Sequence, residues 1–171
     1  FTIDAKDKRR RLVNLVDAWP EQYFNLELKE NGGVTFGGGY RRADGKYNGA
    51  GIGSKTLLAL NVWAQIACVF DREARKLRVY VNGKLEVESE LSAEFEGDLR
   101  NEKPITLGSA WQGALGAVDA FQVWKGALSA GKISADYEAR KARYGKPAPR
   151  PSEAATAASP TAEALPPERQ G

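Results

Sequence analysis

The sequence contains no histidine, no methionine and a single cysteine among its 171 residues. The missing histidine excludes Ser-His-Asp and Cys-His catalytic groups and histidine-ligated zinc. One cysteine excludes an internal disulfide and any paired-cysteine metal site, and it leaves the redox compartment undetermined. The apolar runs are all shorter than the roughly 18 residues of a membrane helix. Any catalysis would therefore have to use carboxylates, lysine, tyrosine or a hard metal ion.

The charge balance is nearly even, with 25 basic and 22 acidic side chains and a net charge of +3. This excess is too small to indicate a nucleic-acid partner, and we expect neither nucleic acid nor a membrane as partner. The chain opens at Phe1 without methionine and without the pattern of a signal peptide. We interpret this opening as that of a processed chain or of a part of a longer protein.

The composition changes near Gly145. Residues 146–171 hold six of the eight prolines and no aromatic residue. Such a segment cannot bury enough apolar surface to offset the entropy of ordering it. We therefore predict a folded domain over residues 1–145, followed by a disordered Pro/Ala-rich linker or tail over residues 146–171.

Most of the predicted domain has the two-residue apolar alternation of β-strands. The predicted strands are 24–28, 34–36, 63–70, 77–81, 85–91, 104–108 and 118–124. Asn82-Gly83 predicts a two-residue hairpin turn. Residues 37–55 are rich in glycine and asparagine, and we predict a long loop there. Residues 6–11 are basic and predict a second exposed loop.

A helix is expected near the end of the domain. Ser129 has the position of a helix N-cap, and Ile133 and Tyr137 follow at the spacing of one helical face. Many short antiparallel strands and one terminal helix indicate an all-β sandwich.

Several segments carry a family likeness. Residues 63–71, WAQIACVFD, and 77–84, LRVYVNGK, resemble the W-x-x-V-A, Y-D and L-Y-V-N-G signature of laminin-G-like jelly rolls in the concanavalin A-like lectin and glucanase superfamily. Residues 105–108 resemble the I-x-L-G strand of that family, and 115–133 resemble its closing stretch. Phe1-Thr2-Ile3 resembles an early strand. These motifs are mostly scaffold motifs, so they indicate a fold more strongly than a function.

The resemblance implies an antiparallel jelly-roll sandwich that lacks its first one or two strands, with an open edge or one covered by another domain. It implies a non-catalytic binding module, for carbohydrate, within a larger extracellular, periplasmic or cell-surface protein. The alternative is a structural or protein-interaction domain that packs on a neighbouring domain. A glycoside hydrolase fragment is the least favoured interpretation.

Aromatic residues in predicted loops are the candidates for sugar stacking, with polar neighbours for the hydroxyl groups. The candidate ligand-binding residues are Tyr40, Arg42, Asp44, Tyr47, Trp111 and Gln112, and Trp19 lies in a further predicted loop. Packing against the core is an equally weighted interpretation of each loop aromatic. The residues expected in the core are Trp63, Cys68, Phe70, Phe121 and Trp124.

Two groups of acidic residues are candidates for chemistry. Glu86, Glu88 and Glu90 alternate on one predicted strand, and jelly-roll glucanases place their catalytic acids in such a row. Nothing apolar is expected beside this row to raise a pKa, so a solvated face is favoured. A second acidic group in one loop comprises Glu94, Glu96, Asp98, Asn101 and Glu102. Its spacing fits no twelve-residue calcium loop. We expect no cofactor and keep Ca²⁺ as an open alternative.

A last motif, residues 49–56, differs from a phosphate-binding loop by one glycine. It lacks the preceding buried strand and the following helix that such a loop requires. We therefore do not assign nucleotide binding to it.

Overall fold

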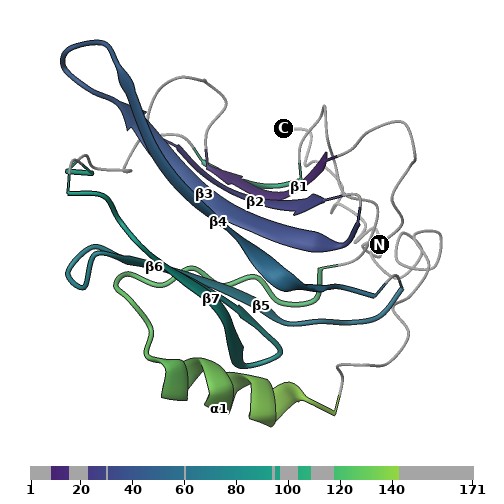
Figure 1. Cartoon of the computed structure of the whole chain (residues 1–171). Helices are drawn as coiled ribbons and strands as arrows, with labels where there is room; N and C mark the ends of the chain where they lie inside the picture. The colour runs from purple at the N-terminus through teal and green to yellow at the C-terminus, as the bar shows by residue number, and fades with distance from the viewer. Residues whose placement is uncertain are drawn as a thin grey trace, which may run out of the picture.

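The computed structural model describes residues 9–15, 23–29, 31–59, 61–93, 95–96, 104–108 and 118–142. Two antiparallel sheets form its layers (Figure 1). The five-stranded sheet has the order β4-β3-β2-β1-β8, and its strands are β1 (Arg9–Leu15), β2 (Tyr23–Lys29), β3 (Gly33–Arg41), β4 (Tyr47–Leu57) and β8 (Ile105–Leu107). The three-stranded sheet has the order β5-β6-β7, with β5 (Ile66–Asp71), β6 (Lys76–Val81) and β7 (Lys84–Glu90). One helix, α1 (Ala130–Arg140), follows. The predicted all-β sandwich with a C-terminal helix is confirmed.

The core lies between the two sheets. Alternate residues of β3 and β4, including Phe36 and Ile52, meet Leu77 and Val79 of β6 in one buried cluster. A second cluster consists of Leu28, Val34, Leu58 and Val81. Because successive side chains in a strand point to opposite faces, the odd-numbered residues of β2, β3 and β4 lie on the outer face of the five-stranded sheet. That outer face carries the candidate site described below.

The β6–β7 hairpin turns at Asn82 and Gly83, as predicted. Both residues have positive φ, +50° and +75°, which is the backbone of a type I′ turn. A Cβ on Gly83 would lie 2.8 Å from the Cβ of Tyr137 in α1. This glycine therefore meets two demands, the turn conformation and the close approach of the helix.

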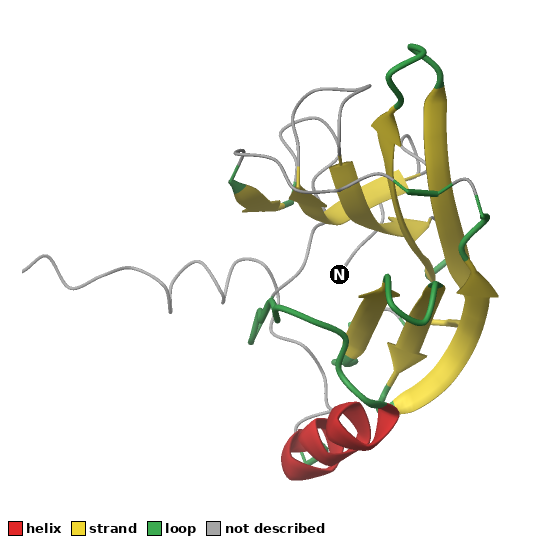
Figure 2. Cartoon of the chain, turned by 90° about the vertical axis from the view of Figure 1, so that its left-hand side faces the viewer, coloured by secondary structure: helices red, strands yellow, loops and turns green. Residues whose placement is uncertain are grey.

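The helix covers the outer face of the three-stranded sheet (Figure 2). The Ser129 hydroxyl accepts a hydrogen bond from the Lys132 amide at 3.2 Å, which confirms the predicted N-cap. Ile133 is 2% exposed and packs against Val69 and Tyr80. The predicted domain boundary at 145/146 and the tail lie outside the described residues, so both stay predictions.

The predicted long loop over residues 37–55 is wrong. β3 continues to Arg41, and β4 begins at Tyr47, so only a short turn separates them. Glycine weakens isolated strands, which favoured a loop from sequence alone. Here the glycines pair with one another across the sheet, Gly37 with Gly51 and Gly39 with Gly49. The basic run is corrected too, because its residues 9–11 begin β1.

Residues 118–124 do not form the predicted strand. The segment is irregular and runs from the sheets toward α1 (Figure 1). Phe121 is 40% exposed and Trp124 is 52% exposed, so neither is a core residue. No described strand pairs with this segment, and without such a ladder its side chains are not held against the core. By contrast, Phe70 and Cys68 pack against the core cluster as expected. Trp63 lies before β5 and is half-buried.

Candidate functional site

Two tyrosines form an aromatic platform on the outer face of the five-stranded sheet. The rings of Tyr23 and Tyr47 are nearly parallel, with 12° between their planes and 6.1 Å between their centroids. The Tyr47 hydroxyl donates a hydrogen bond to the Tyr23 hydroxyl at 2.5 Å. Tyr47 is 38% exposed. We call this pair the tyrosine platform.

Glycines determine how the platform lies. A Cβ on Gly39 would sit 2.0 Å from the Tyr47 hydroxyl oxygen, and one on Gly49 would sit 2.5 Å from the same atom. The Tyr47 ring therefore rests directly on the backbone of both strands, at positions where any other residue would displace it. Contact of an aromatic ring with glycine backbone across strands also compensates for the weak packing of glycine in a sheet.

The Tyr47 phenol is uncharged at neutral pH. Burial, followed by the hydrogen bond with Tyr23, raises the pKa of Tyr47 above its ordinary value. The hydroxyl of Tyr47 consequently stays protonated and keeps its hydrogen bond. The two tyrosines offer ring surface for stacking and hydroxyl groups for hydrogen bonding.

A polar turn lies beside the platform. It connects β3 to β4 and forms the tip of the long hairpin at the upper left of Figure 1. The Arg42 amide donates to the Lys46 carbonyl oxygen at 2.8 Å, and the Lys46 amide donates to Asp44 Oδ1 at 3.0 Å. Arg42 Nε lies 3.6 Å from Asp44 Oδ2. The predicted site residues Arg42 and Asp44 are thus both exposed, and both are close in sequence to Tyr47.

Tyr40 does not join this surface. The odd-numbered residues of β3, including Arg41, are on the outer face, so the side chain of Tyr40 faces the core. Tyr40 is only 8% exposed. Its hydroxyl accepts a hydrogen bond from the Glu96 amide at 3.1 Å, and its ring meets Phe95 edge-on at 5.3 Å. The predicted loop position of Tyr40 is therefore wrong, and its ring is not open to a ligand. Trp19, Trp111 and Gln112 lie outside the described residues.

Tyr23 was missed by the sequence analysis. Tyr23 is an odd-numbered residue of β2, so its side chain is on the outer face. The sequence signal that points to this surface is the pair of Gly-x-Gly patterns at 37–39 and 49–51. When the two strands align, these glycines form a surface without side chains, on which an aromatic ring of a neighbouring strand can lie.

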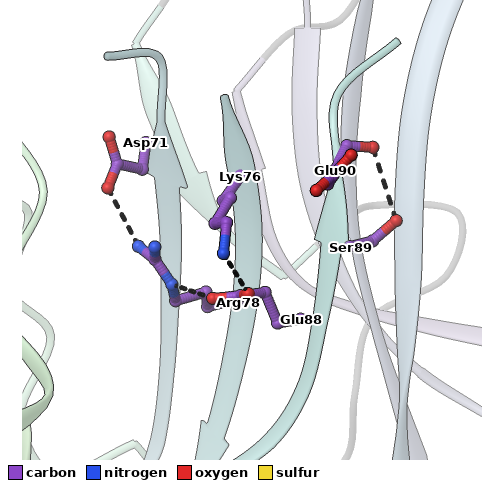
Figure 3. Close-up of polar contacts among 6 residues, drawn as sticks. All are labelled: Asp71, Lys76, Arg78, Glu88, Ser89 and Glu90. Atoms are coloured by element: carbon purple, nitrogen blue, oxygen red, sulfur yellow. Dashed lines mark hydrogen bonds and ion pairs between the residues drawn. The ribbon is translucent and has the colours of Figure 1, made fainter. Parts of the chain in front are cut away.

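The three glutamates of β7 do not form a catalytic row. A β-bulge interrupts the pairing of β6 with β7, and Glu86 accepts a hydrogen bond from the Thr56 amide of β4 at 3.1 Å. Glu88 is held by Lys76 and by Arg78 Nε, the latter at 2.6 Å (Figure 3). These hydrogen bonds, that from Lys76 first, lower the pKa of Glu88. A general acid needs the opposite shift.

Arg78 joins the three strands of the smaller sheet. It contacts Asp71 of β5 at 2.9 Å in addition to Glu88 of β7, so the two ion pairs join the central strand to both of its neighbours (Figure 3). Each carboxylate is already matched by a cation. We therefore assign this group a structural role in holding the strand register.

The described residues contain no group of three or more acidic, cysteine or histidine side chains that would hold a metal ion. Of the acidic loop considered for calcium, only Glu96 is described, so the calcium alternative stays untested. The described part of the chain also contains no helix that is long and apolar enough to span a membrane.

Comparison with solved structures gives matches to binding domains. The binding domain of Paraclostridial Mosquitocidal Protein 1 matches with a TM-score of 0.55 and 17% identity over 77% of this chain and 32% of that one. The binding domain of Botulinum neurotoxin serotype D matches with a TM-score of 0.55 and 17% identity over 81% of this chain and 34% of that one. The chain thus spans about a third of each toxin domain.

The CBM40 of Ruminococcus gnavus IT-sialidase matches with a TM-score of 0.52 and 18% identity, over 78% of this chain and 76% of that one. The same CBM40 has also been solved bound to α2,3-sialyllactose. At these identities the matches establish the fold alone. No curated protein matches the chain. The family model described as the concanavalin A-like lectin/glucanases superfamily matches residues 2–134, and the chain belongs to this superfamily.

Proposed function

We propose that this protein is a non-catalytic carbohydrate-binding module of a larger protein, and that the tyrosine platform is its binding surface. The observation that carries the proposal is the Tyr47 ring, which lies flat on glycine backbone and is joined to Tyr23. One face of the ring rests on the sheet, so the other face is directed outward. A flat aromatic surface of this kind accepts the apolar face of a sugar ring.

The polar groups around the platform suit the sugar hydroxyls. The phenol oxygens of Tyr23 and Tyr47 both donate and accept hydrogen bonds, while Arg42 donates and Asp44 accepts. The exposed turn brings the last two beside the platform without burying a charge. The likeness to a fold that binds sialyllactose in a CBM40 supports this class of ligand. An extracellular, periplasmic or cell-surface location accords with it.

The test is a glycan array that includes α2,3-sialyllactose, followed by titration calorimetry of the best ligand. Tyr47→Ala should weaken binding about tenfold or more, because it removes the stacking surface. Tyr47→Phe keeps the ring and should lose less. Phe121→Ala is the matched control, since it removes an aromatic residue of nearly equal exposure, 40% against 38%, elsewhere in the chain. Binding that survives Tyr47→Ala unchanged contradicts the site, and the failure of every glycan to bind contradicts the class.

A second candidate function, protein interaction, is favoured by the apolar segment 118–124. Four large apolar residues there are between 40% and 59% exposed, namely Val118, Phe121, Val123 and Trp124. Apolar residues gathered in one exposed segment are typical of an interface. This function predicts self-association in sedimentation velocity that Trp124→Ala abolishes. A monomer at all concentrations would count against it.

A further inference from the structure

We infer that a linear saccharide chain lies along β4, on a strip of glycines that continues from the tyrosine platform. This inference rests on the proposed function and adds to it the shape of the ligand. We call the residues Gly37, Gly39, Gly49, Gly51 and Gly53 the glycine strip.

The strip is a flat, side-chain-free part of the outer face. Gly49, Gly51 and Gly53 follow Tyr47 at every second position of β4, so they share its face. Gly37 and Gly39 stand opposite Gly51 and Gly49 in β3 and are buried, so the exposed part of the strip belongs to β4. From Tyr47 to Gly53 the strip extends about 20 Å at the usual rise of a strand. This length exceeds a single sugar ring several times.

The fold requires only part of the strip to be glycine. Gly39 and Gly49 must be glycine because Tyr47 lies on them, and a Cβ on Gly37 would sit 2.8 Å from the Ala50 carbonyl oxygen. Among the described residues, a Cβ on Gly51 or Gly53 would meet nothing nearer than 3.6 Å, which is ordinary contact. Neither residue has a positive φ.

Glycine weakens a strand, so its presence at these two positions calls for another reason. The backbone there is left bare where the fold would tolerate a side chain. Glycine at such a position is typical of a place where a ligand approaches the backbone closely. We therefore assign Gly51 and Gly53 to the ligand rather than to the fold.

Polar groups line the far end of the strip. The hydroxyl oxygen of Thr35 is buried and has no hydrogen-bond partner in the part of the chain that the structure describes. It lies 4.0 Å from the place of a Cβ on Gly53, and the Lys29 ammonium lies 3.7 Å from the same place. Thr35 pairs with both Glu27 and Gly53 across the sheet, so it stands at the side of the strip. Lys29 is exposed and flexible, so it can move aside and let a sugar hydroxyl reach Thr35.

A saccharide suits this surface better than other chains. β4 is an edge strand, and an extended peptide could add to its edge through backbone hydrogen bonds. Such a peptide would lie in the plane of the sheet and would not cover the strip, which is on the sheet face. A nucleic acid would need a basic surface, but Glu27 lies beside the strip and the net charge is only +3. A row of sugar rings offers flat surfaces to the strip and hydroxyl groups to Thr35 and Lys29.

The test compares short and long ligands on variants that should fold as well as the parent chain. Laminarin, cellulose, mannan, chitin, alginate and polygalacturonate are screened first, and the disaccharide and hexasaccharide of the polymer that binds are then titrated. Gly51→Val fills the strip with a residue that strands favour. Thr35→Val removes the unpartnered hydroxyl at nearly constant volume. Both variants should keep or raise the melting temperature.

The expected result is that the parent binds the hexasaccharide about tenfold more tightly than the disaccharide. Gly51→Val and Thr35→Val should each remove most of this difference. Gly131→Ala in α1 is the matched control, because its Cβ meets nothing within 4 Å and it lies on the other sheet's side. The inference is overturned if the parent binds both lengths with equal affinity, or if the hexasaccharide-to-disaccharide affinity ratio is unchanged in both variants. In either case, disaccharide binding that depends on Tyr47 would still support the proposed function. If no polymer binds, the inference fails, and the proposed function fails with it only if every glycan of the array also fails to bind.

Discussion

Gly39→Ala tests the physical basis of the tyrosine platform. The new methyl group would lie 2.0 Å from the Tyr47 hydroxyl oxygen and 2.8 Å from the Asn48 carbonyl oxygen. Tyr47 can rotate away because it is partly exposed, but the Asn48 carbonyl is backbone and moves only if β3 and β4 separate. Overpacking of this kind costs about 1–3 kcal/mol. We therefore expect Gly39→Ala to lower the free energy of unfolding by this amount.

Gly51→Ala is the matched comparison, since it lies on the same face of the same pair of strands. Its methyl group would meet the Phe36 carbonyl oxygen at 3.6 Å, which is ordinary contact. The loss of glycine's freedom in the unfolded chain should then raise the free energy of unfolding by about 0.4–1 kcal/mol. The two alanine variants thus move in opposite directions, although both replace a strand glycine.

Urea unfolding followed by far-ultraviolet circular dichroism measures both free energies. Near-ultraviolet circular dichroism of Gly39→Ala should also change, because the Tyr23–Tyr47 stack is disturbed. In a Tyr47→Ala background the cost of Gly39→Ala should shrink without vanishing, since the contact with the Asn48 carbonyl remains. Equal unfolding midpoints for Gly39→Ala and Gly51→Ala would refute the reasoning.

Three further predictions concern stability. The pKa of Asp71 is lowered first by a hydrogen bond from a backbone amide in the following turn and then by one from Arg78. The stabilisation by ionised Asp71 is therefore present above the unfolded-state pKa of about 3.9, and it is lost as the pH falls through the lower pKa of the folded state. Arg78→Met should therefore cost about 1 kcal/mol at pH 7, with a smaller difference from the parent near pH 2 in urea unfolding; a difference independent of pH contradicts the ion pair. Leu77→Ala should cost about 2–5 kcal/mol because Leu77 is 1% exposed, whereas Leu85→Ala, at a 51% exposed position, should cost less than about 0.5 kcal/mol in the same assay. Ser129→Ala should lower the free energy of unfolding by about 1 kcal/mol through loss of the N-cap, and an unchanged melting curve would argue against that cap.

The features that the sequence determined are local ones. The Asn82-Gly83 turn follows from two adjacent residues that tolerate positive φ, and the helix start follows from Ser129 and the spacing of the residues behind it. The alternation of apolar residues in β2 and β6 reports which face of each strand is buried. These signals depend on neighbours in the chain, and together with the family motifs they were sufficient for the fold class.

The tertiary structure decided the candidate site. Tyr23 and Tyr47 are separated by β3 and the turns around it, and they meet only because three strands align in register. The same alignment places glycines that look like a loop in the sequence on the surface of a sheet. Tyr40 faces the core because it is one position away from the residues on the outer face. A bulge, which no local pattern announces, moves Glu86 out of its row. Contacts across strands depend on register, and register is fixed by the packing of the whole sandwich rather than by any single segment.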